Sequence, residues 1–346
     1  MENSTVTAYE FTPTTYYETG EDSENIYRFV QIFSIVVFSI TFILGITGNG
    51  MVLWIAGFKM RKTVNIIWFL NLAVADFGFD ALFPLEITEW IMDEHWPFGQ
   101  TMCKVMYTVL FLNMSVSTSF LMIISVDRCL LIMFPVWSKQ HRSHKTAWTI
   151  SAAVWLTCFM LSSPYLAFFN IDHDITDNAT YCIAFYSHDY DTYNMRYTTM
   201  LMVRFVSMFL IPFSIIVICY SLILFRLRRI RSLSRKNRPL KVIVTIVLCF
   251  FGFWFPYHIW PLLEVMDVEV NPTVDYVMFH LVNCIGFFNS CVNPMVYVFA
   301  GRDFKKTLFK SIPSYLENTL KEKEISETEH QFDQVAMETE MEAYSL

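Results

Sequence analysis

The sequence predicts an all-α membrane protein, a bundle of seven transmembrane helices followed by a short amphipathic eighth helix. Of its 346 residues 54% are hydrophobic and only 16% are charged, whereas soluble domains carry about 25% charged residues. Long uncharged segments recur along the chain, and the short segments between them alternate between acidic and basic. The composition excludes a disordered chain, a collagen and a disulfide-stapled mini-protein.

The uncharged segments are long enough to cross a bilayer, whose hydrocarbon core of about 30 Å requires roughly 20 helical residues. Those without Asp, Glu, Lys or Arg are 29–58, 105–126, 146–171, 205–225, 242–263 and 276–301. A seventh apolar segment, 63–92, contains Asp76, Asp80, Glu86 and Glu89. We expect one of its faces to contact protein or water. Seven crossings place the two ends of the bundle's chain on opposite sides.

The orientation follows from the basic residues, which are concentrated in cytoplasmic loops of membrane proteins. Lys and Arg gather after the first, third and fifth predicted helices, with the largest group at 226–241. The other connecting segments, including 1–27 and 172–200, are acidic. The sequence therefore predicts a multi-pass protein with its N-terminus outside the cell and its tail inside. The formal net charge of -7 conceals this polarity.

Cysteine and glycosylation patterns agree with this topology. Six of the eight cysteines fall in or at the inner edge of the predicted helices, where they act as small buried side chains. Cys103 and Cys182 are the pair that faces the oxidising side, so we expect one disulfide between them. Asn3 and Asn178 begin glycosylation sequons on the same side. The sequon at Asn113 lies within a predicted helix and is not expected to be used.

Several polar residues lie at bilayer depth, where an ionised side chain costs about 2.5 to 3.5 kcal/mol. If the second, third and seventh helices adjoin, these residues can converge on one site. Carboxylate, amide and hydroxyl oxygens are ligands for a hard cation, but they also form hydrogen bonds that join helices. Both interpretations stay open on spacing alone. The residues are Asp76, Asn113, Ser117, Asn289 and Asn293.

An ordered set of motifs resembles the class A, rhodopsin-like G-protein-coupled receptors, and covers all seven segments. The motifs are Gly48-Asn49, Leu72-Ala73-Val74-Ala75-Asp76, Asp127-Arg128-Cys129, Trp155, Pro212 with Tyr220, Phe253-Trp254-Phe255-Pro256 and Asn293-Pro294-Met295-Val296-Tyr297. Within the class, several stretches resemble the chemoattractant receptors, nearest to the chemerin and formyl-peptide receptors. They are Asp127-Arg128-Cys129, Trp96-Pro97-Phe98-Gly99, Pro135-Val136-Trp137-Ser138 followed by His141-Arg142, Asn289-Ser290-Cys291, and 63–65 with 68–77.

This resemblance implies an organisation and a signalling mechanism. Residues 1–27 are an acidic extracellular N-terminus, 28–301 the seven-transmembrane receptor domain, 302–313 the amphipathic helix and 314–346 a disordered cytoplasmic tail. Asp127 would hold Arg128 in the resting state, and Tyr220 and Tyr297 would move toward Arg128 when it engages a G protein. The polar set around Asp76 would bind a regulatory sodium ion. The acidic partner that many members use to lock this Arg is missing, because 235–238 reads Arg-Lys-Asn-Arg.

The resemblance also locates a ligand pocket. Arg204, flanked by apolar residues in the fifth helix, would hold a ligand carboxylate; alternatively it snorkels to the interface or pairs with Glu86 or another acid. The remaining predicted ligand-binding residues are Tyr107, Phe111, Trp254, Tyr257, His258, Glu86 and Glu264.

These expectations describe a plasma-membrane receptor for an extracellular chemoattractant peptide or small protein, not an enzyme. It would signal through an inhibitory heterotrimeric G protein, with receptor kinases and arrestin acting on a tail cluster at Ser326 and Thr328, in leukocyte chemotaxis or inflammation. Membrane lipids surround it, no nucleic acid is involved, and no cofactor is expected beyond the sodium ion. The alternatives are a receptor for a carboxylate-bearing lipid mediator and a scavenging receptor that engages arrestin without a G protein.

Overall fold

The computed structural model describes residues 21–174, 178–229, 238–266, 268, 270–300 and 307. For 21–23, 227–229, 238–250, 264 and 295–300 it describes the backbone alone. Residues 1–300 form one compact unit and 301–346 a second one, of which only Thr307 is described. The expected amphipathic helix at 302–313 and the expected tail therefore lie outside the described residues, apart from Thr307.

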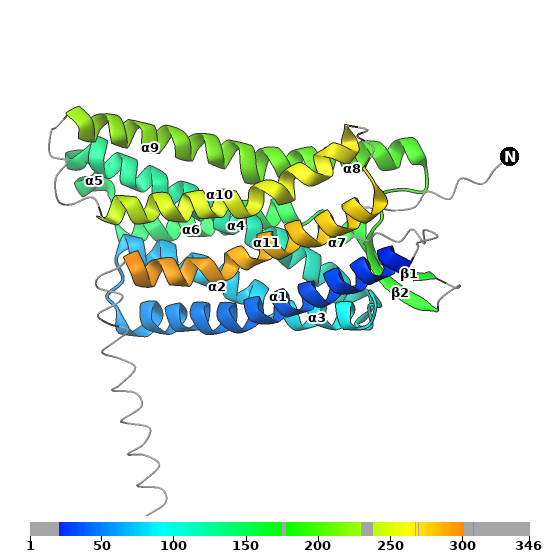
Figure 1. Ribbon diagram of the computed structural model, residues 1–346. Helices are drawn as coiled ribbons and strands as arrows, with labels where there is room; N and C mark the ends of the chain where they lie inside the picture. Colours follow the sequence, from blue (N-terminus) through cyan, green and yellow to red (C-terminus); the bar gives the residue numbers. More distant parts are fainter. Residues whose placement is uncertain are drawn as a thin grey trace, which may run out of the picture. The chain divides into compact units, whose positions relative to one another are not determined.

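Long helices make up most of the first unit (Figure 1). The chain runs through α1 (Glu21–Trp54), π-helix η1 (Ile55–Lys59), α2 (Val64–Asp80), α3 (Phe83–Ile91), α4 (Gly99–Met133), α5 (Pro135–His141), α6 (His144–Ser162), α7 (Tyr165–Phe168), strands β1 (Phe169–Asp174) and β2 (Ala179–Ala184), α8 (Tyr190–Arg204), π-helix η2 (Phe205–Leu210), α9 (Ile211–Arg229), α10 (Arg238–Val265) and α11 (Pro272–Ala300).

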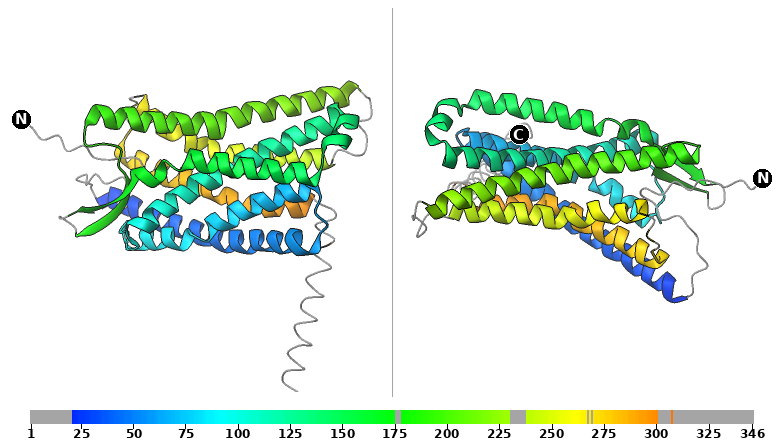
Figure 2. Two further views of the ribbon diagram at one scale, coloured as in Figure 1. Left: turned by 180° about the vertical axis from the view of Figure 1, so that it is seen from behind. Right: turned by 90° about the horizontal axis from the view of Figure 1, so that it is seen from above.

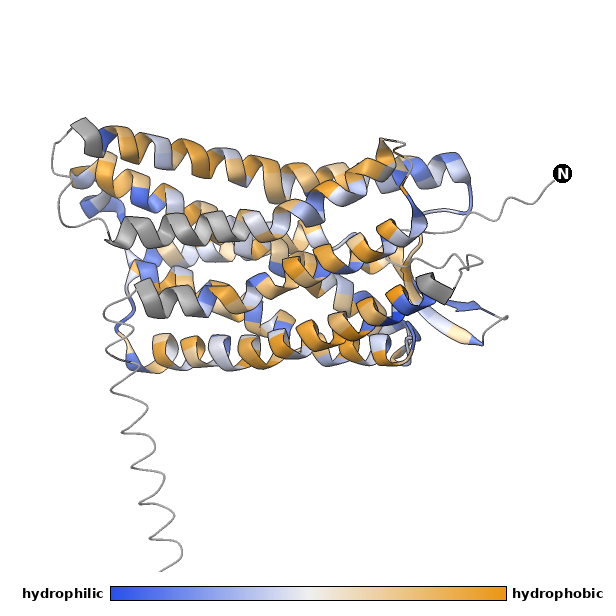
Figure 3. Ribbon diagram, in the orientation of Figure 1, coloured by the Kyte–Doolittle hydropathy of each residue, from blue (hydrophilic) through white to orange (hydrophobic). Residues whose placement is uncertain are grey.

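Each of the seven predicted spans is formed mainly by helix, although 146–171 ends in the first residues of β1. Five helical segments within the described residues are long and apolar enough to cross a bilayer: Glu24–Lys59, Val64–Ile91, Gly99–Met133, His144–Phe168 and Tyr190–Arg226. The 28 residues of α10 and the 29 of α11 supply the sixth and seventh. Helical backbone satisfies its own hydrogen bonds, which lipid cannot do. Figure 3 shows apolar residues along the helices and polar ones gathered toward their ends.

Helix α4 occupies the centre of the bundle. It packs against α2, α6 and α9, while α1 packs against α2 and α11, and α10 against α11. Figures 1 and 2 show the helices running side by side, with the β1–β2 hairpin at one end and α5 at the other. Side chains that α4 directs inward therefore meet residues from most of the bundle.

Local sequence signals set the ends and breaks of the helices. Thr63, Ser143 and Asp189 cap the starts of α2, α6 and α8 by accepting a hydrogen bond from a backbone N–H of the first turn. The second span is interrupted between α2 and α3, where Pro84 falls in the first turn of the new helix. A proline fits there because the N–H groups of a first turn have no helical acceptor.

The outer end carries structure that an all-α prediction omits. Strands β1 and β2 pair in antiparallel register, with Ile171 opposite Cys182. Cys182 is bonded to Cys103 in the first turns of α4, with 5.6 Å between their Cα atoms, so the expected disulfide is confirmed. The hairpin is held further by the backbone N–H of Trp96, which donates to the carbonyl of Thr180 at 2.6 Å. The disulfide and this hydrogen bond together hold the β1–β2 hairpin at the outer end of the bundle.

Candidate functional site

The polar residues predicted at bilayer depth converge on Asp76, whose side chain is 0% exposed. Asn113 Nδ2 and Ser117 Oγ, both on α4, donate to its Oδ1 at 2.9 and 3.1 Å. Asn293 Nδ2, on α11, donates to Oδ2 at 2.8 Å. The second, third and seventh helices thus meet at one carboxylate, as the spacing required. Asn289 is buried as well, but none of these three hydrogen bonds comes from it.

A second carboxylate, Asp80, lies one turn along α2 and is also fully buried. Asn49 Nδ2 donates to Asp80 Oδ2 at 2.9 Å and to the carbonyl of Ser290 at 3.1 Å, which joins α1, α2 and α11. Gly45 makes room for this acid, because a Cβ there would collide with the carboxylate of Asp80. The sequence showed Asp80 as a charge within a span, but its partner Asn49 is 31 residues away and no local pattern indicates it.

Arg204 lies at the end of α8, is 1% exposed and has its guanidinium among aromatic rings. Its guanidinium carbon is 5.5 Å from the ring centroid of Phe111 and 5.3 Å from that of Tyr257. Phe111 stacks on Tyr165 at 3.6 Å between centroids. This burial excludes snorkelling to the membrane surface, because a snorkelling arginine keeps its charged head in water.

Other predicted ligand-binding residues belong to the same aromatic cluster. Trp254 meets Tyr257 edge to face at 5.3 Å, and His258 packs on Phe209 at 5.3 Å. Neither ring nitrogen of His258 has a hydrogen-bond partner among the described residues. Tyr107 stacks on Phe169 of β1 at 3.9 Å, which links the cavity to the disulfide-anchored hairpin. The structure therefore gathers Arg204, Phe111, Trp254, Tyr257 and His258 into one buried cluster.

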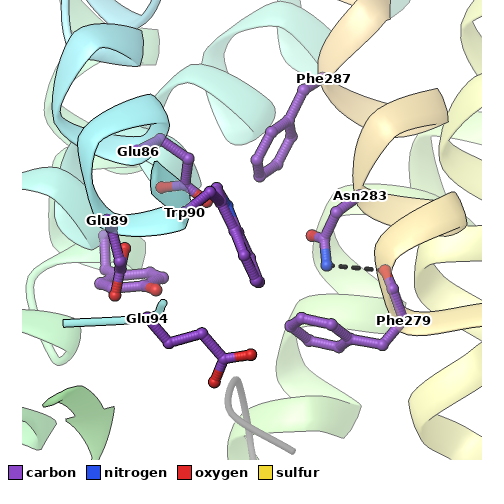
Figure 4. Close-up of a pocket in the computed structure, with 8 residues that line it drawn as sticks. Glu86, Glu89, Trp90, Glu94, Phe279, Asn283 and Phe287 are labelled. Atoms are coloured by element: carbon purple, nitrogen blue, oxygen red, sulfur yellow. Dashed lines mark hydrogen bonds between the residues drawn. The ribbon is translucent and has the colours of Figure 1, made fainter. Parts of the chain in front are cut away.

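Glu86 lies in a separate pocket whose lining does not include Arg204 (Figure 4). Glu89, Trp90 and Glu94 from α3 and its following turn share this pocket with Tyr107 from α4. Phe279, Asn283 and Phe287 of α11 form the opposite wall. Glu86 was predicted as a ligand-binding residue. Glu89 was predicted only as an acid on a face that contacts protein or water, and Glu94 was not predicted at all; the signal that they share is acidic residues near one end of a span.

At the inner end the structure differs from the expected pairing of Asp127 with Arg128. The carboxylate of Asp127 accepts from Arg142, with Nε–Oδ1 at 2.8 Å and Nη2–Oδ2 at 3.1 Å. Arg142 Nη2 also donates to Asn65 Oδ1 at 2.6 Å. A planar guanidinium satisfies both carboxylate oxygens at once, which leaves Asp127 occupied. Arg128 Nε is buried with no hydrogen-bond partner among the described residues.

Several other predicted residues have a definite place. The Tyr220 side chain is buried on α9, and its hydroxyl lacks a hydrogen-bond partner in the described part of the chain. Asn178 is exposed in the turn between β1 and β2, with φ at 55°, a left-handed conformation that Asn tolerates. Asn3 and the side chains of Glu264 and Tyr297 lie outside the described residues.

The fold and these sites define a class of protein. Residues 48–297 match the family described as 7 transmembrane receptor (rhodopsin family). The chain therefore belongs to the rhodopsin-like G-protein-coupled receptors, a family of multi-pass membrane proteins.

Among its relatives are chemoattractant receptors. The chain is 42% identical to chemerin-like receptor 1 of Mus musculus and 43% identical to that of Sus scrofa, each over 307 residues. These alignments cover 85% of this chain and 82% and 84% of the relatives. It is 36% identical to N-formyl peptide receptor 3 of Homo sapiens over 305 residues, covering 84% of this chain and 85% of the relative. The chain thus falls in the chemoattractant receptor group.

Proposed function

We propose that this protein is a cell-surface receptor for a chemoattractant peptide or small protein, and that Arg204 holds the C-terminal carboxylate of its ligand. The observation that supports this proposal is that the Arg204 guanidinium is buried among aromatic rings. A charge in such surroundings is strongly favoured to meet a ligand carboxylate, because the low local dielectric strengthens the attraction.

The cavity suits the hydrophobic part of the same ligand. Phe111, Tyr257 and Trp254 provide aromatic surfaces, which contribute large apolar area with defined geometry. The relatives named for chemerin and formyl peptides support a peptide or protein ligand. A lipid mediator with a carboxylate head would also satisfy Arg204, so this second candidate is kept.

For signalling, we assign the inner end of α4 to the G protein. Arg128 and Tyr220 lie at this end, and the Asp127–Arg142 pair connects α4 to the residue that follows α5. Movement of the helices would expose Arg128 to an inhibitory heterotrimeric G protein. Receptor kinases and arrestin would then act on the cytoplasmic tail, and the expected physiological outcome is leukocyte chemotaxis or inflammation at the plasma membrane.

Asp76 and its partners fit a regulatory sodium ion. The support is a buried carboxylate beside a hydroxyl oxygen, hard ligands that such a cation prefers, and two amides that donate to Asp76 and would offer their oxygens after turning over. Asp76, Ser117 and Asn113 would hold the ion, with Asn289 and Asn293 completing the polar surroundings. The ion would neutralise the buried charge and favour the resting arrangement of α2, α4 and α11.

A ligand screen tests the proposed function. Cells expressing the receptor are exposed to chemoattractant peptides with free or amidated C-termini and to carboxylate-bearing lipid mediators, and cyclic AMP inhibition and arrestin recruitment are both recorded. The proposal expects responses in both assays to free-acid peptides and weaker responses to their amides. Responses confined to lipids favour the second candidate, and arrestin recruitment without inhibition of cyclic AMP favours a scavenging receptor.

A further inference from the structure

The pocket of Figure 4 brings acidic residues together in a place that the proposed carboxylate site does not use. Glu86 and Glu89 come from α3 and are 7% and 5% exposed, and Glu94 joins them from the following turn. Trp90 stands between them and the wall formed by α11. The pocket is thus a carboxylate cluster enclosed by aromatic rings.

These carboxylates lack a compensating cation. In the part of the chain that the structure describes, no ion pair joins Glu86, Glu89 or Glu94 to a Lys or Arg. Burying an ionised carboxylate without a partner is costly, so such groups are paired, protonated or coordinated. A bound positive charge would remove this cost, and a proton on one acid would remove only part of it.

The opposite wall supplies an independent sign of a missing donor. Asn283 is 7% exposed, and its Nδ2 donates to the carbonyl of Phe279 at 2.9 Å. Because a carbonyl can only accept, this bond fixes the orientation of the amide and leaves Oδ1 facing the pocket (Figure 4). That Oδ1 is buried and has no hydrogen-bond partner among the described residues. An acceptor in this position requires a donor that the described residues do not provide.

We propose that this pocket binds a primary ammonium group of the ligand beside the Trp90 ring, with the carboxylates that line the pocket and the Oδ1 of Asn283 as the available acceptors. An ammonium carries three N–H donors and no acceptor, so it suits a pocket lined by unpaired acceptors. The faces of Trp90 and Phe279 favour a cation, because aromatic quadrupoles attract positive charge. The pocket admits a group of about the size of a water molecule, which fits an ammonium and not a planar guanidinium.

This inference rests on the proposed function and narrows its ligand. Tyr107 lines the ammonium pocket and Phe111 contacts Arg204. The two residues are four positions apart on α4, so they share one face at roughly 6 Å of helical rise. One ligand can therefore place a carboxylate against Arg204 and an ammonium against Glu89. A peptide with a lysine side chain or a free amino terminus carries both charges, whereas a fatty-acid mediator carries only the first.

Thermal unfolding of the purified receptor tests the pocket without a known agonist. The cationic probes are Nα-acetyl-lysinamide, which carries a side-chain ammonium, and phenylalaninamide, which carries an N-terminal one. Nα-acetyl-norleucinamide and Nα-acetyl-phenylalaninamide are their neutral counterparts, and Nα-acetyl-argininamide tests size. At about 10 mM, at least one ammonium probe should raise the unfolding temperature by about 2 °C or more over its neutral counterpart. The probe that does so identifies the source of the ammonium.

Variants locate the effect. Glu89→Gln and Asn283→Leu should each remove most of the ammonium-dependent shift, while Asp191→Asn should leave it intact. Asp191 is an exposed acid of α8, so its variant makes the same charge change outside the pocket. Glu89→Asp keeps the charge and should retain part of the shift, which separates binding from misfolding.

Two results would overturn the inference: no shift from either ammonium probe in the wild type, or an equal shift in Glu89→Gln. A shift from the arginine probe as large as that from lysine would contradict the assignment to an ammonium. The assay involves neither agonist nor G protein, so it is independent of the ligand screen. A failure of the carboxylate site would appear as signalling that ignores C-terminal amidation, with the ammonium shift unchanged.

Discussion

Asp127 and Arg142 form a two-point ion pair at the inner end of the bundle, at 2.8 and 3.1 Å, in place of the pairing of Asp127 with Arg128. Arg142 immediately follows α5 and also donates to Asn65 on α2. The pair therefore ties the connection between the third and fourth spans to two helices of the bundle. Arg128 therefore has no hydrogen bond to Asp127 among the described residues that its proposed engagement of a G protein would first have to break.

Removing Arg142 should lower basal signalling. In Arg142→Ala the carboxylate of Asp127 is released and can pair with Arg128, which would restrain that residue. Because a partly exposed ion pair contributes roughly 1 kcal/mol, we expect basal nucleotide exchange to fall by about fivefold. The measurement is agonist-free exchange on an inhibitory G protein at matched surface expression. Asp127→Asn combined with Arg142→Ala should restore basal nucleotide exchange. A rise in basal exchange in Arg142→Ala alone would contradict this explanation.

Arg128 should be required for signalling and much less for binding. It lies near the C-terminal end of α4, which is predicted to face the cytoplasm, far along the helix from Tyr107 and Phe111. Arg128→Ala should abolish agonist-stimulated nucleotide exchange while agonist affinity stays within a few fold, since the ligand cavity is unaltered. Radioligand displacement and exchange are measured on the same membranes. Wild-type exchange in this variant would remove Arg128 from the coupling site.

Sodium should weaken agonist binding through Asp76. An ion that favours the resting state must lower agonist affinity, because linkage between two ligands is reciprocal. Typical couplings change the affinity by about 5- to 150-fold. Agonist affinity is measured as sodium replaces a large organic cation at constant ionic strength. Asp76→Asn should abolish the dependence, whereas Ser151→Ala, on α6 and away from Asp76, should retain it. A sodium effect that persists in Asp76→Asn would exclude this site.

Arg204 and the agonist carboxylate should behave as one interaction. Truncating one member of a buried charge pair costs about 2 to 5 kcal/mol, so Arg204→Ala should weaken binding by tens to thousands of fold. Amidating the agonist's C-terminus should cost a similar amount on the wild type and little on the variant, because the pair is already broken. Full additivity of the two losses would show that the groups do not meet.

Stability should fall as the pH rises toward neutrality because of Glu94. Burial, with a smaller contribution from the nearby negative charge of Asp93, raises its pKa from 4.5 to about 7. Between these two values the folded protein holds a proton that the unfolded chain releases, so stability decreases across that window. Glu94→Gln should flatten the decline in unfolding temperature between pH 5 and about pH 7. An unchanged slope in the variant would show that Glu94 is not the titrating group.

The helices could be predicted from the sequence because the evidence for them is local: a segment of about twenty uncharged residues crosses a membrane as a helix. The disulfide could be predicted as well, because Cys103 and Cys182 were the two cysteines expected on the oxidising side and each had only the other as a partner. The convergence on Asp76 was predicted only on the condition that the second, third and seventh helices adjoin, because the spacing of polar residues does not by itself say which helices are neighbours.

The contacts that were missed depend on residues far apart in the chain. Arg142 competes with Arg128 for Asp127 through the placement of α5, which no spacing rule encodes. The pairing of β1 with β2 and the break between α2 and α3 are likewise set by packing at the outer end. Glu89 and Asn283 meet across a pocket only because α3 and α11 form its two walls.

The π-helical turn η2, between Arg204 and Pro212, fixes the rotational setting of the outer half of the fifth span. Each residue of an α-helix advances the side-chain direction by about 100°, so the wider turn holds one residue that a regular helix would not need. Deleting a single residue within 205–210 would let the segment close into a regular helix. Everything on its outer side would then turn relative to α9, and the guanidinium would swing from the interior toward lipid. The number of residues in η2, and not only the presence of Arg204, therefore decides whether a positive charge lies in the interior of the bundle.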